Sequence, residues 1–156
     1  MRKIESFVLE SKPYSIEIDS CFADFSGWKS PFITSSAYKA LQSKGIEIIK
    51  NRNLRNKIVN LYDVQLTRVV DDYDRAEWII YETVIIPFFA KHVRLINDGQ
   101  RVIARPNDFE ELKKSDEFLN ILSMSFRMRK AGLEYYGIAI SEMDLTLSHI
   151  KKELEK

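Results

Sequence analysis

The side chains best suited to chemistry in this chain are two histidines, one cysteine and one unusually placed arginine. A helical zinc or di-iron centre needs ligands three or four residues apart, because such residues share one face of a helix. His92 and His149 are the only histidines, and neither belongs to a Glu-x-x-His pair. We therefore expect no metal site and no resident cofactor.

Other candidate reactive groups are equally weak. Asp71, Asp72 and Asp74 form an acidic run that lacks the loop glycine and the spaced carboxylates of an EF-hand, so we expect a solvated helix face. Cys21 has apolar neighbours, and the sequence shows no base close to it, which favours a buried, inert thiol. As the single cysteine it also forms no intrachain disulfide. No catalytic residue is assigned, although 23 acidic residues leave room for two carboxylates to meet in space.

Arg129 is the one binding candidate, because it occupies a position where the surrounding helical pattern is otherwise apolar. An unpaired guanidinium is costly to bury. One interpretation is that Arg129 reaches the surface or pairs with an acidic residue of a neighbouring long helix. The other makes it an anion-binding group inside a helical bundle, close to Tyr73 or Tyr136. The substitution Arg129→Met separates a loss of ligand binding from a loss of stability.

Charge and hydropathy limit the partners that we expect. The chain has 156 residues, and its 24 basic and 23 acidic side chains are interleaved, which argues against a nucleic-acid-binding surface. The longest apolar run, residues 78–90, is interrupted by Glu82 and Pro87 and is too short to span a bilayer as a helix. The first residues lack the apolar core of a signal peptide. We expect a protein partner or self-association.

Two long helices would have to position these groups. Residues 116–155 contain no proline and carry an inner stripe of mostly apolar residues at spacings of three and four, which predicts one long helix: Leu119, Leu122, Phe126, Arg129, Leu133, Tyr136, Ile140, Met143, Leu147, Ile150 and Leu154. A similar stripe predicts a second long helix: Leu54, Ile58, Tyr62, Leu66, Val69, Tyr73, Ala76, Ile80 and Val84. Pro87 should kink or end that helix.

Shorter signals complete the expected fold. A helix should begin near Ala37 and end at Gly45, and Asn51 or Asn53 should cap the helix that follows. Asp98-Gly99 between two β-prone runs predicts a small β-hairpin near residues 94–104. Asn107 or Asp108 should cap a short helix, and Asp116 should begin the last one. Residues 1–34 should be irregular or form a partial first helix.

Together these elements predict an all-α protein with one domain over residues 1–156. The expected architecture is an antiparallel bundle of about four helices, two of them long, with coiled-coil-like packing. A chain of this length buries enough surface for a core without disulfide or metal support. A stripe as regular as the one in residues 119–154 can be covered within one chain or by a second copy.

Packing, capping and turn residues recur in blocks along the chain. The first block reads Ala37-Tyr38-x-x-Leu41-x-x-x-Gly45-x-x-x-Ile49-x-Asn51-x-x-Leu54-Arg55-x-x-Ile58-x-x-Leu61-Tyr62. Later blocks read Pro106-x-Asp108-Phe109-x-x-Leu112, Glu117-Phe118-x-Asn120-x-Leu122 and Ile150-x-x-Glu153-Leu154. Over residues 35–155 this pattern resembles an uncharacterised bacterial family of membrane-anchored helical proteins.

The resemblance implies an N-terminal membrane helix followed by a helical domain outside the cytoplasm, with no known activity and no catalytic residues. Compared with that pattern, we expect this chain to lack the anchor and part of the first bundle helix. If the resemblance holds, the domain lies on the extracytoplasmic face of a bacterial membrane and meets the membrane only through that anchor. Otherwise we expect a soluble cytoplasmic protein.

Three functions follow as hypotheses. The first is a noncatalytic protein-interaction or sensory module, because long antiparallel helices offer extended surfaces and transmit small shifts along their axes. The second is a bundle that binds a small anion, with Arg129 as its pointer. The third is a hydrolase or transferase without a recognisable motif, which would require a cleft with converging titratable groups.

Overall fold

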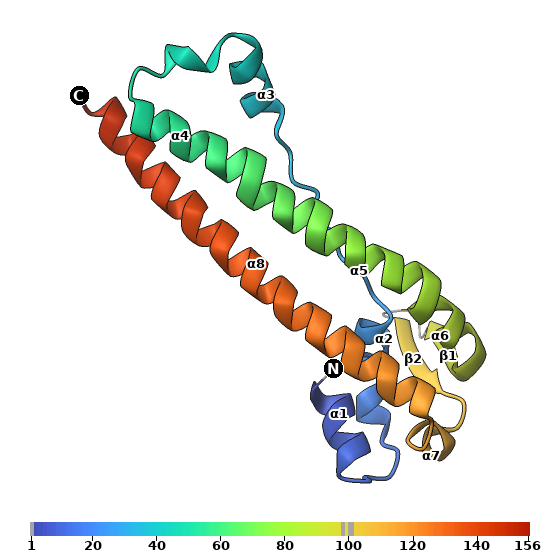
Figure 1. The fold of residues 1–156 in the computed structure, drawn as a ribbon. Coiled ribbons are helices and arrows are strands. Elements are labelled where there is room, and N and C mark those ends of the chain that lie inside the picture. The colour runs from blue at the N-terminus through green and yellow to red at the C-terminus, as the bar shows by residue number, and fades with distance from the viewer. Residues whose placement is uncertain (1, 98, 100–101) are drawn as a thin grey trace. The chain divides into compact units, whose positions relative to one another are not determined.

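The structure is a computed structural model that describes residues 2–97, 99 and 102–156, and it is mainly helical with one small antiparallel sheet (Figure 1). Two compact units divide the chain. The first unit comprises Met1–Lys29 and Glu77–Arg129, and the second comprises Ser30–Ala76 and Lys130–Lys156. The broadly all-α prediction is confirmed, whereas the single domain and the bundle of four helices stay predictions.

The N-terminal part of the first unit is more ordered than expected for residues 1–34. Helix α1 (Arg2–Leu9), the 3-10 turn η1 (Ile16–Ile18) and α2 (Asp19–Phe25) all contribute fully buried side chains to one core. Phe22 of α2 stacks on Phe118 at 5.9 Å between ring centroids, and Phe118 stacks on Phe88 at 5.8 Å. Aromatic rings therefore hold segments together that lie far apart in the sequence.

A two-stranded hairpin completes the first unit, as predicted. Strands β1 (Val93–Asn97) and β2 (Val102–Pro106) pair antiparallel, with Val93 opposite Pro106 and Asn97 opposite Val102. Gly99 has a φ of +86°, a conformation that favours glycine. Asp98, the other half of the predicted turn signal, lies outside the described residues. The short helix α7 (Phe109–Leu112) follows, and the Asp108 side chain caps it as predicted.

The first predicted long helix is a continuous helical stretch over residues 52–92 that alternates α- and π-helical turns. Its segments are α4 (Arg52–Asn60), η3 (Leu61–Leu66), η4 (Arg68–Asp74), α5 (Arg75–Ile80), η5 (Tyr81–Ile85) and α6 (Ile86–His92), and η3, η4 and η5 are π-helical. Every member of its predicted inner stripe is buried or half-buried.

Pro87 was predicted to kink or end this helical stretch. The stretch does not end there, because α6 continues to His92, and the kink stays a prediction. Pro87 occupies the first turn of α6, directly after the π-helical segment η5. In a regular α-helix a proline ring collides with the carbonyl four residues earlier. A widened turn just before the proline removes that collision and lets the helical stretch continue.

The second unit contains α3 (Ser36–Ser43), the 3-10 turn η2 (Ile46–Ile48) and antiparallel portions of the two long helices (Figure 1). Gly45 ends α3 with a φ of +90°, and the Asn51 side chain caps α4 by accepting from two backbone amides. Asn51 Nδ2 also donates to Glu153 Oε2 at 2.6 Å. These contacts confirm the predicted turn and cap and fix the register of the two helices within this unit.

Helix α8 (Asp116–Leu154) begins at the predicted residue. In the second unit its predicted inner stripe is only partly correct, because Tyr136 and Ile150 pack against hydrophobic clusters whereas most of the other members are exposed. The column that is buried there is Gly132, Ala139 and Thr146, at seven-residue spacing. Leu133, Ile140, Leu147 and Leu154 are exposed instead. Helix axes approach more closely where the facing side chains are small. The tyrosines of the helical stretch over residues 52–92 therefore pack against the face of α8 that carries Gly132 and not against the face that carries Leu133.

Candidate functional site

Arg129 is a partnered side chain in the first unit. Its Nε donates to Glu77 Oε1 at 2.9 Å, and one terminal nitrogen, Nη2, donates to the carbonyl oxygens of Phe25 and Gly27 at 3.2 and 2.9 Å. The guanidinium also lies over the Phe25 ring. These carbonyls belong to the C-terminal end of α2, where a helix leaves acceptors unsatisfied and favours a cation. The predicted pairing with an acidic residue of the other long helix is therefore observed, and anion binding stays a prediction.

The other groups singled out from the sequence do not converge. His92 stacks on Phe88 in the first unit, and the half-buried His149 belongs to the second unit. Cys21 is half-buried against the core of the first unit rather than fully buried. Among the described residues, no group of three or more histidine, cysteine, aspartate or glutamate side chains could hold a metal ion.

Asp74 corrects the expectation of a solvated acidic run. Asp71 and Asp72 are exposed, but Asp74 is buried and accepts a hydrogen bond from Ser30 Oγ at 2.7 Å. Its other carboxylate oxygen, Oδ1, has no partner among the described residues. This hydrogen bond joins residues 44 positions apart, and the spacing of apolar residues along one helix cannot predict such a contact.

One titratable cluster was missed by the sequence analysis. Asp19 is almost fully buried in the first unit, where the Tyr14 hydroxyl donates to its Oδ1 at 2.7 Å. Arg105 of β2 donates to Asp19 Oδ2 from Nε and Nη2, each at 2.9 Å. Desolvation and the bond to Asp19 raise the pKa of Tyr14. A cavity of about 370 Å³ adjoins this cluster, but both carboxylate oxygens are engaged in tying β2 to the N-terminal segment.

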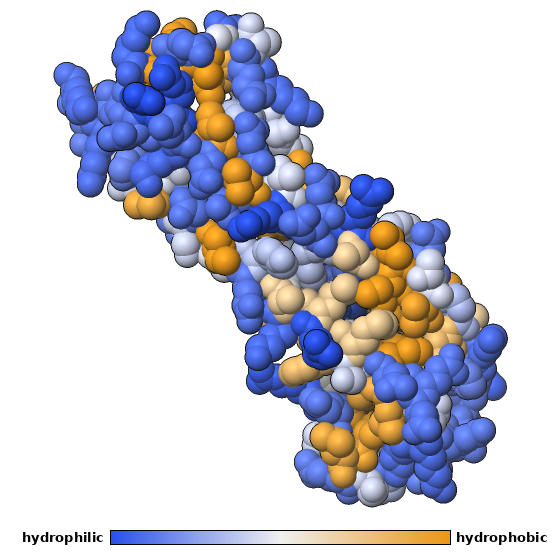
Figure 2. All heavy atoms as spheres, in the orientation of Figure 1, coloured by the Kyte–Doolittle hydropathy of each residue, from blue (hydrophilic) through white to orange (hydrophobic). Residues whose placement is uncertain are grey.

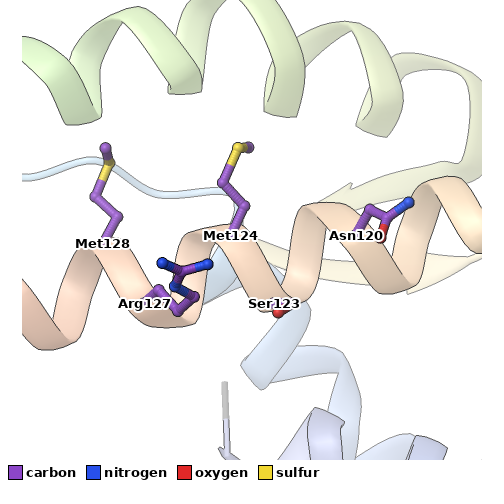
Figure 3. Close-up of a pocket in the computed structure, with 5 residues that line it drawn as sticks. All are labelled: Asn120, Ser123, Met124, Arg127 and Met128. Carbon is purple, nitrogen blue, oxygen red and sulfur yellow. The ribbon is translucent and has the colours of Figure 1, made fainter.

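A cavity of about 500 Å³ lies on the surface of α8 (Figure 3). Asn120, Ser123, Met124, Arg127 and Met128 line it, and all five side chains project from this one helix (Figure 3). Recognition of a small molecule requires a few polar groups that converge from different directions. The shape of this surface therefore offers less to a ligand than a groove between helices.

Exposed apolar residues form a regular stripe on α8 in the second unit. Leu133, Ile140, Leu147 and Leu154 follow one another at seven-residue intervals, and their exposed fractions are 74%, 54%, 50% and 81%. We call these four residues the α8 stripe. Figure 2 shows one face of the second unit, on which a few hydrophobic residues lie among mostly hydrophilic ones. A coiled-coil seam has two apolar positions in every seven residues. The stripe supplies one of these positions in each repeat and is therefore suited to pairing with another helix.

An apolar groove of about 360 Å³ lies beside this stripe in the second unit. Three helical segments contribute its lining, which contains no charged side chain: α3 gives Ala37, Tyr38 and Leu41; α4 and η3 give Ile58, Leu61 and Tyr62; α8 gives Met143, Thr146, Leu147 and Ile150. The rings of Tyr38 and Tyr62 stack at 4.3 Å with an interplanar angle of 7°. Aromatic surface thus forms one wall of the groove.

Two hydroxyl groups in the groove lining differ in their partners. The Tyr38 hydroxyl donates to Asp63 Oδ2 at 2.9 Å, and burial together with this bond raises the pKa of Tyr38 to about 12. Thr146 is buried, and its hydroxyl has no hydrogen-bond partner among the described residues. Tyr38 is therefore a neutral, engaged group at ordinary pH, whereas Thr146 retains unused hydrogen-bonding capacity.

Neither surface was identified from the sequence. The seven-residue spacing of the α8 stripe is readable in the sequence, but it was assigned to the interior because the pattern does not say which face of a helix is covered. The groove depends on α3, whose position relative to α4 and α8 follows from long-range packing. No sequence signal singles out Thr146, whose direct neighbours are Leu145 and Leu147.

Two further findings bear on identity. Within the described residues, no helix has the length and apolar character needed to cross a membrane. The resemblance to a membrane-anchored helical family and the location that it implies remain predictions. Comparisons with protein-family models, curated proteins and solved structures find no match for this chain.

Proposed function

We propose that this chain is a noncatalytic protein-interaction module that self-associates through helix α8. The observation that carries the proposal is the α8 stripe, four large apolar residues at seven-residue spacing that are all at least half exposed. A side chain of this size gains about 1.5–3 kcal/mol when it is fully removed from water. Four in a row on one helix favour a contact with another apolar helix.

A second copy of the chain is the partner that we propose. Every copy carries the same stripe, and a two-fold symmetric interface needs one surface that is complementary to itself. Apolar residues that repeat every seven positions keep facing a partner helix along the whole contact when the two helices supercoil. The coiled-coil packing expected from the sequence would then use these same four residues to contact a second copy instead of the chain's own helices.

Sedimentation velocity over a range of concentrations tests the proposal. We expect the wild-type chain to form dimers and Ile140→Glu to be monomeric at the same concentrations. Each copy of the dimer would lose the burial of an isoleucine and would place a carboxylate in an apolar contact, so the dimer Kd should rise by at least ~100-fold.

Leu145→Glu is the matched control. Leu145 is also a large, exposed residue of α8, but it lies two positions from Leu147 and therefore roughly 200° around the helix from the stripe. This variant should dimerise like the wild type. A wild-type chain that remains monomeric, or equal weakening by both variants, would refute self-association through the α8 stripe.

A further inference from the structure

The groove in the second unit has the properties of a small-molecule site. This inference does not rest on the pairing proposed for α8, although Leu147 belongs both to the α8 stripe and to the groove lining. Its volume of about 360 Å³ falls within the range of roughly 300–1,000 Å³ that is common for ligand pockets. The lining is formed by three helical segments and is apolar apart from hydroxyl and thioether groups. An ion would lose its hydration here without meeting an opposite charge, so the lining selects an uncharged ligand.

Thr146 adds a specific polar feature to this apolar surface. It belongs to the lining, it is only 3% exposed, and its hydroxyl has no partner among the described residues. A buried hydroxyl without a hydrogen bond destabilises the folded chain. The hydroxyl oxygen is itself buried, so a ligand that carries one hydrogen-bonding group would satisfy it when the side chain rotates toward the groove. A hydroxyl both donates and accepts.

The aromatic wall indicates the shape of the apolar part of the ligand. Tyr38 and Tyr62 are stacked on each other, and the Tyr38 hydroxyl is held by Asp63. Tyr38 is only 5% exposed, so the half-buried Tyr62 supplies most of the accessible ring surface. Tyr38 has no need of a ligand to satisfy its hydroxyl. Ring faces and edges of this kind contact planar aromatic groups favourably.

We propose that this groove binds a small, uncharged aromatic molecule that carries a single hydrogen-bonding group, which pairs with the Thr146 hydroxyl. A suitable probe is N-phenyl-1-naphthylamine, which is uncharged, aromatic and carries one N–H group. Its fluorescence rises when it leaves water. Titration into the full chain should give a saturable signal with one site per chain.

Two variants test the location and the hydrogen bond separately. Ala37 is an exposed lining residue of α3, so Ala37→Trp should fill the groove and weaken probe binding by at least tenfold. Thr146→Val keeps the side-chain shape but removes the hydroxyl, and we expect about three- to tenfold weaker binding. Without probe, the same Thr146→Val variant should show a higher Tm, because the unpaired buried hydroxyl is gone.

Lys39→Trp is the control for Ala37→Trp, because Lys39 is an exposed residue of the same helix that does not line the groove. It should bind the probe like the wild type. The proposal is overturned if the probe signal does not saturate, if Ala37→Trp and Lys39→Trp bind equally well, or if Thr146→Val leaves affinity unchanged. Ile140→Glu leaves the lining intact, so probe binding by this variant separates the groove from the proposed self-association.

Discussion

Two glycines of helix α8 should respond in opposite ways to the same substitution. A β-carbon added at Gly132 would lie 2.1 Å from Cζ and 2.4 Å from Cε2 of Tyr73, whereas one added at Gly137 would meet nothing within 4 Å. We predict that Gly132→Ala destabilises the chain and that Gly137→Ala stabilises it. The pair is well matched because both residues lie in the interior of one helix.

The magnitudes follow from two opposing effects. Alanine is more favourable than glycine in a helix interior by about 0.8–1.0 kcal/mol, and Gly137→Ala should gain this amount. At Gly132 the Tyr73 ring would have to retreat by roughly 1.4 Å to reach an ordinary carbon contact of about 3.5 Å. Tyr136 packs edge-to-face on Tyr73 at 5.7 Å and restricts that movement. Overpacking costs about 1–3 kcal/mol. After the gain of about 1 kcal/mol from alanine in a helix, Gly132→Ala should lower the free energy of unfolding by up to about 2 kcal/mol.

Urea unfolding followed by circular dichroism measures both changes, and thermal unfolding provides a second readout. For a chain of this size, about 2 kcal/mol corresponds to a Tm lower by roughly 4–8 °C. The double variant Gly132→Ala with Tyr73→Leu should be less destabilised than the sum of the single variants, because the shorter side chain removes the overlap. If Gly132→Ala proved as stable as Gly137→Ala, the close packing of Tyr73 on α8 would be refuted.

Three further predictions concern polar contacts. Arg129→Met should lower stability by about 2–3 kcal/mol because Glu77 and the α2 carbonyls lose a charged donor, and a double-mutant cycle with Glu77→Gln should show coupling. The pKa of Tyr38 is raised from 10 to about 12. Its hydrogen bond as a neutral phenol therefore stabilises the fold below pH 10, and this contribution is lost as the pH rises toward 12. Tyr38→Phe should remove the step at highest pH from an ultraviolet titration of the tyrosines. Arg105→Met should lower the urea midpoint, because it strands the buried carboxylate of Asp19. Asp19→Asn with Arg105→Met together should lower it by less than the sum of the two single changes.

Local signals in the sequence predicted much of the secondary structure. Asn51 and Asp108 cap helices at the expected positions, Gly45 ends one, Asp116 begins the last one, and the hairpin pairs as its β-prone runs suggested. Each of these signals acts within a few residues of the chain. Pro87 is the exception, because the widened turn before it accommodates a residue that usually interrupts a helix.

The candidate surfaces were predicted less well, because periodicity alone leaves the covered face undetermined. The apolar repeat of α8 suggested that Leu133 and Ile140 face inward, yet Gly132 and Ala139 are the buried residues in the second unit. Close approach of two helices depends on how small the facing side chains are, and that choice involves residues of the other helix such as Tyr73.

By itself the sequence determined that this chain forms helices, where most of them begin and end, and that its charges are balanced, because these properties depend on neighbouring residues and composition. Only the tertiary structure decided that Arg129 binds Glu77 and the end of α2 and that Asp19 and Asp74 are buried. It also decided that the α8 stripe is exposed and that a groove forms beside Thr146. These outcomes depend on contacts between segments separated by tens of residues, which compete for the same faces of a helix.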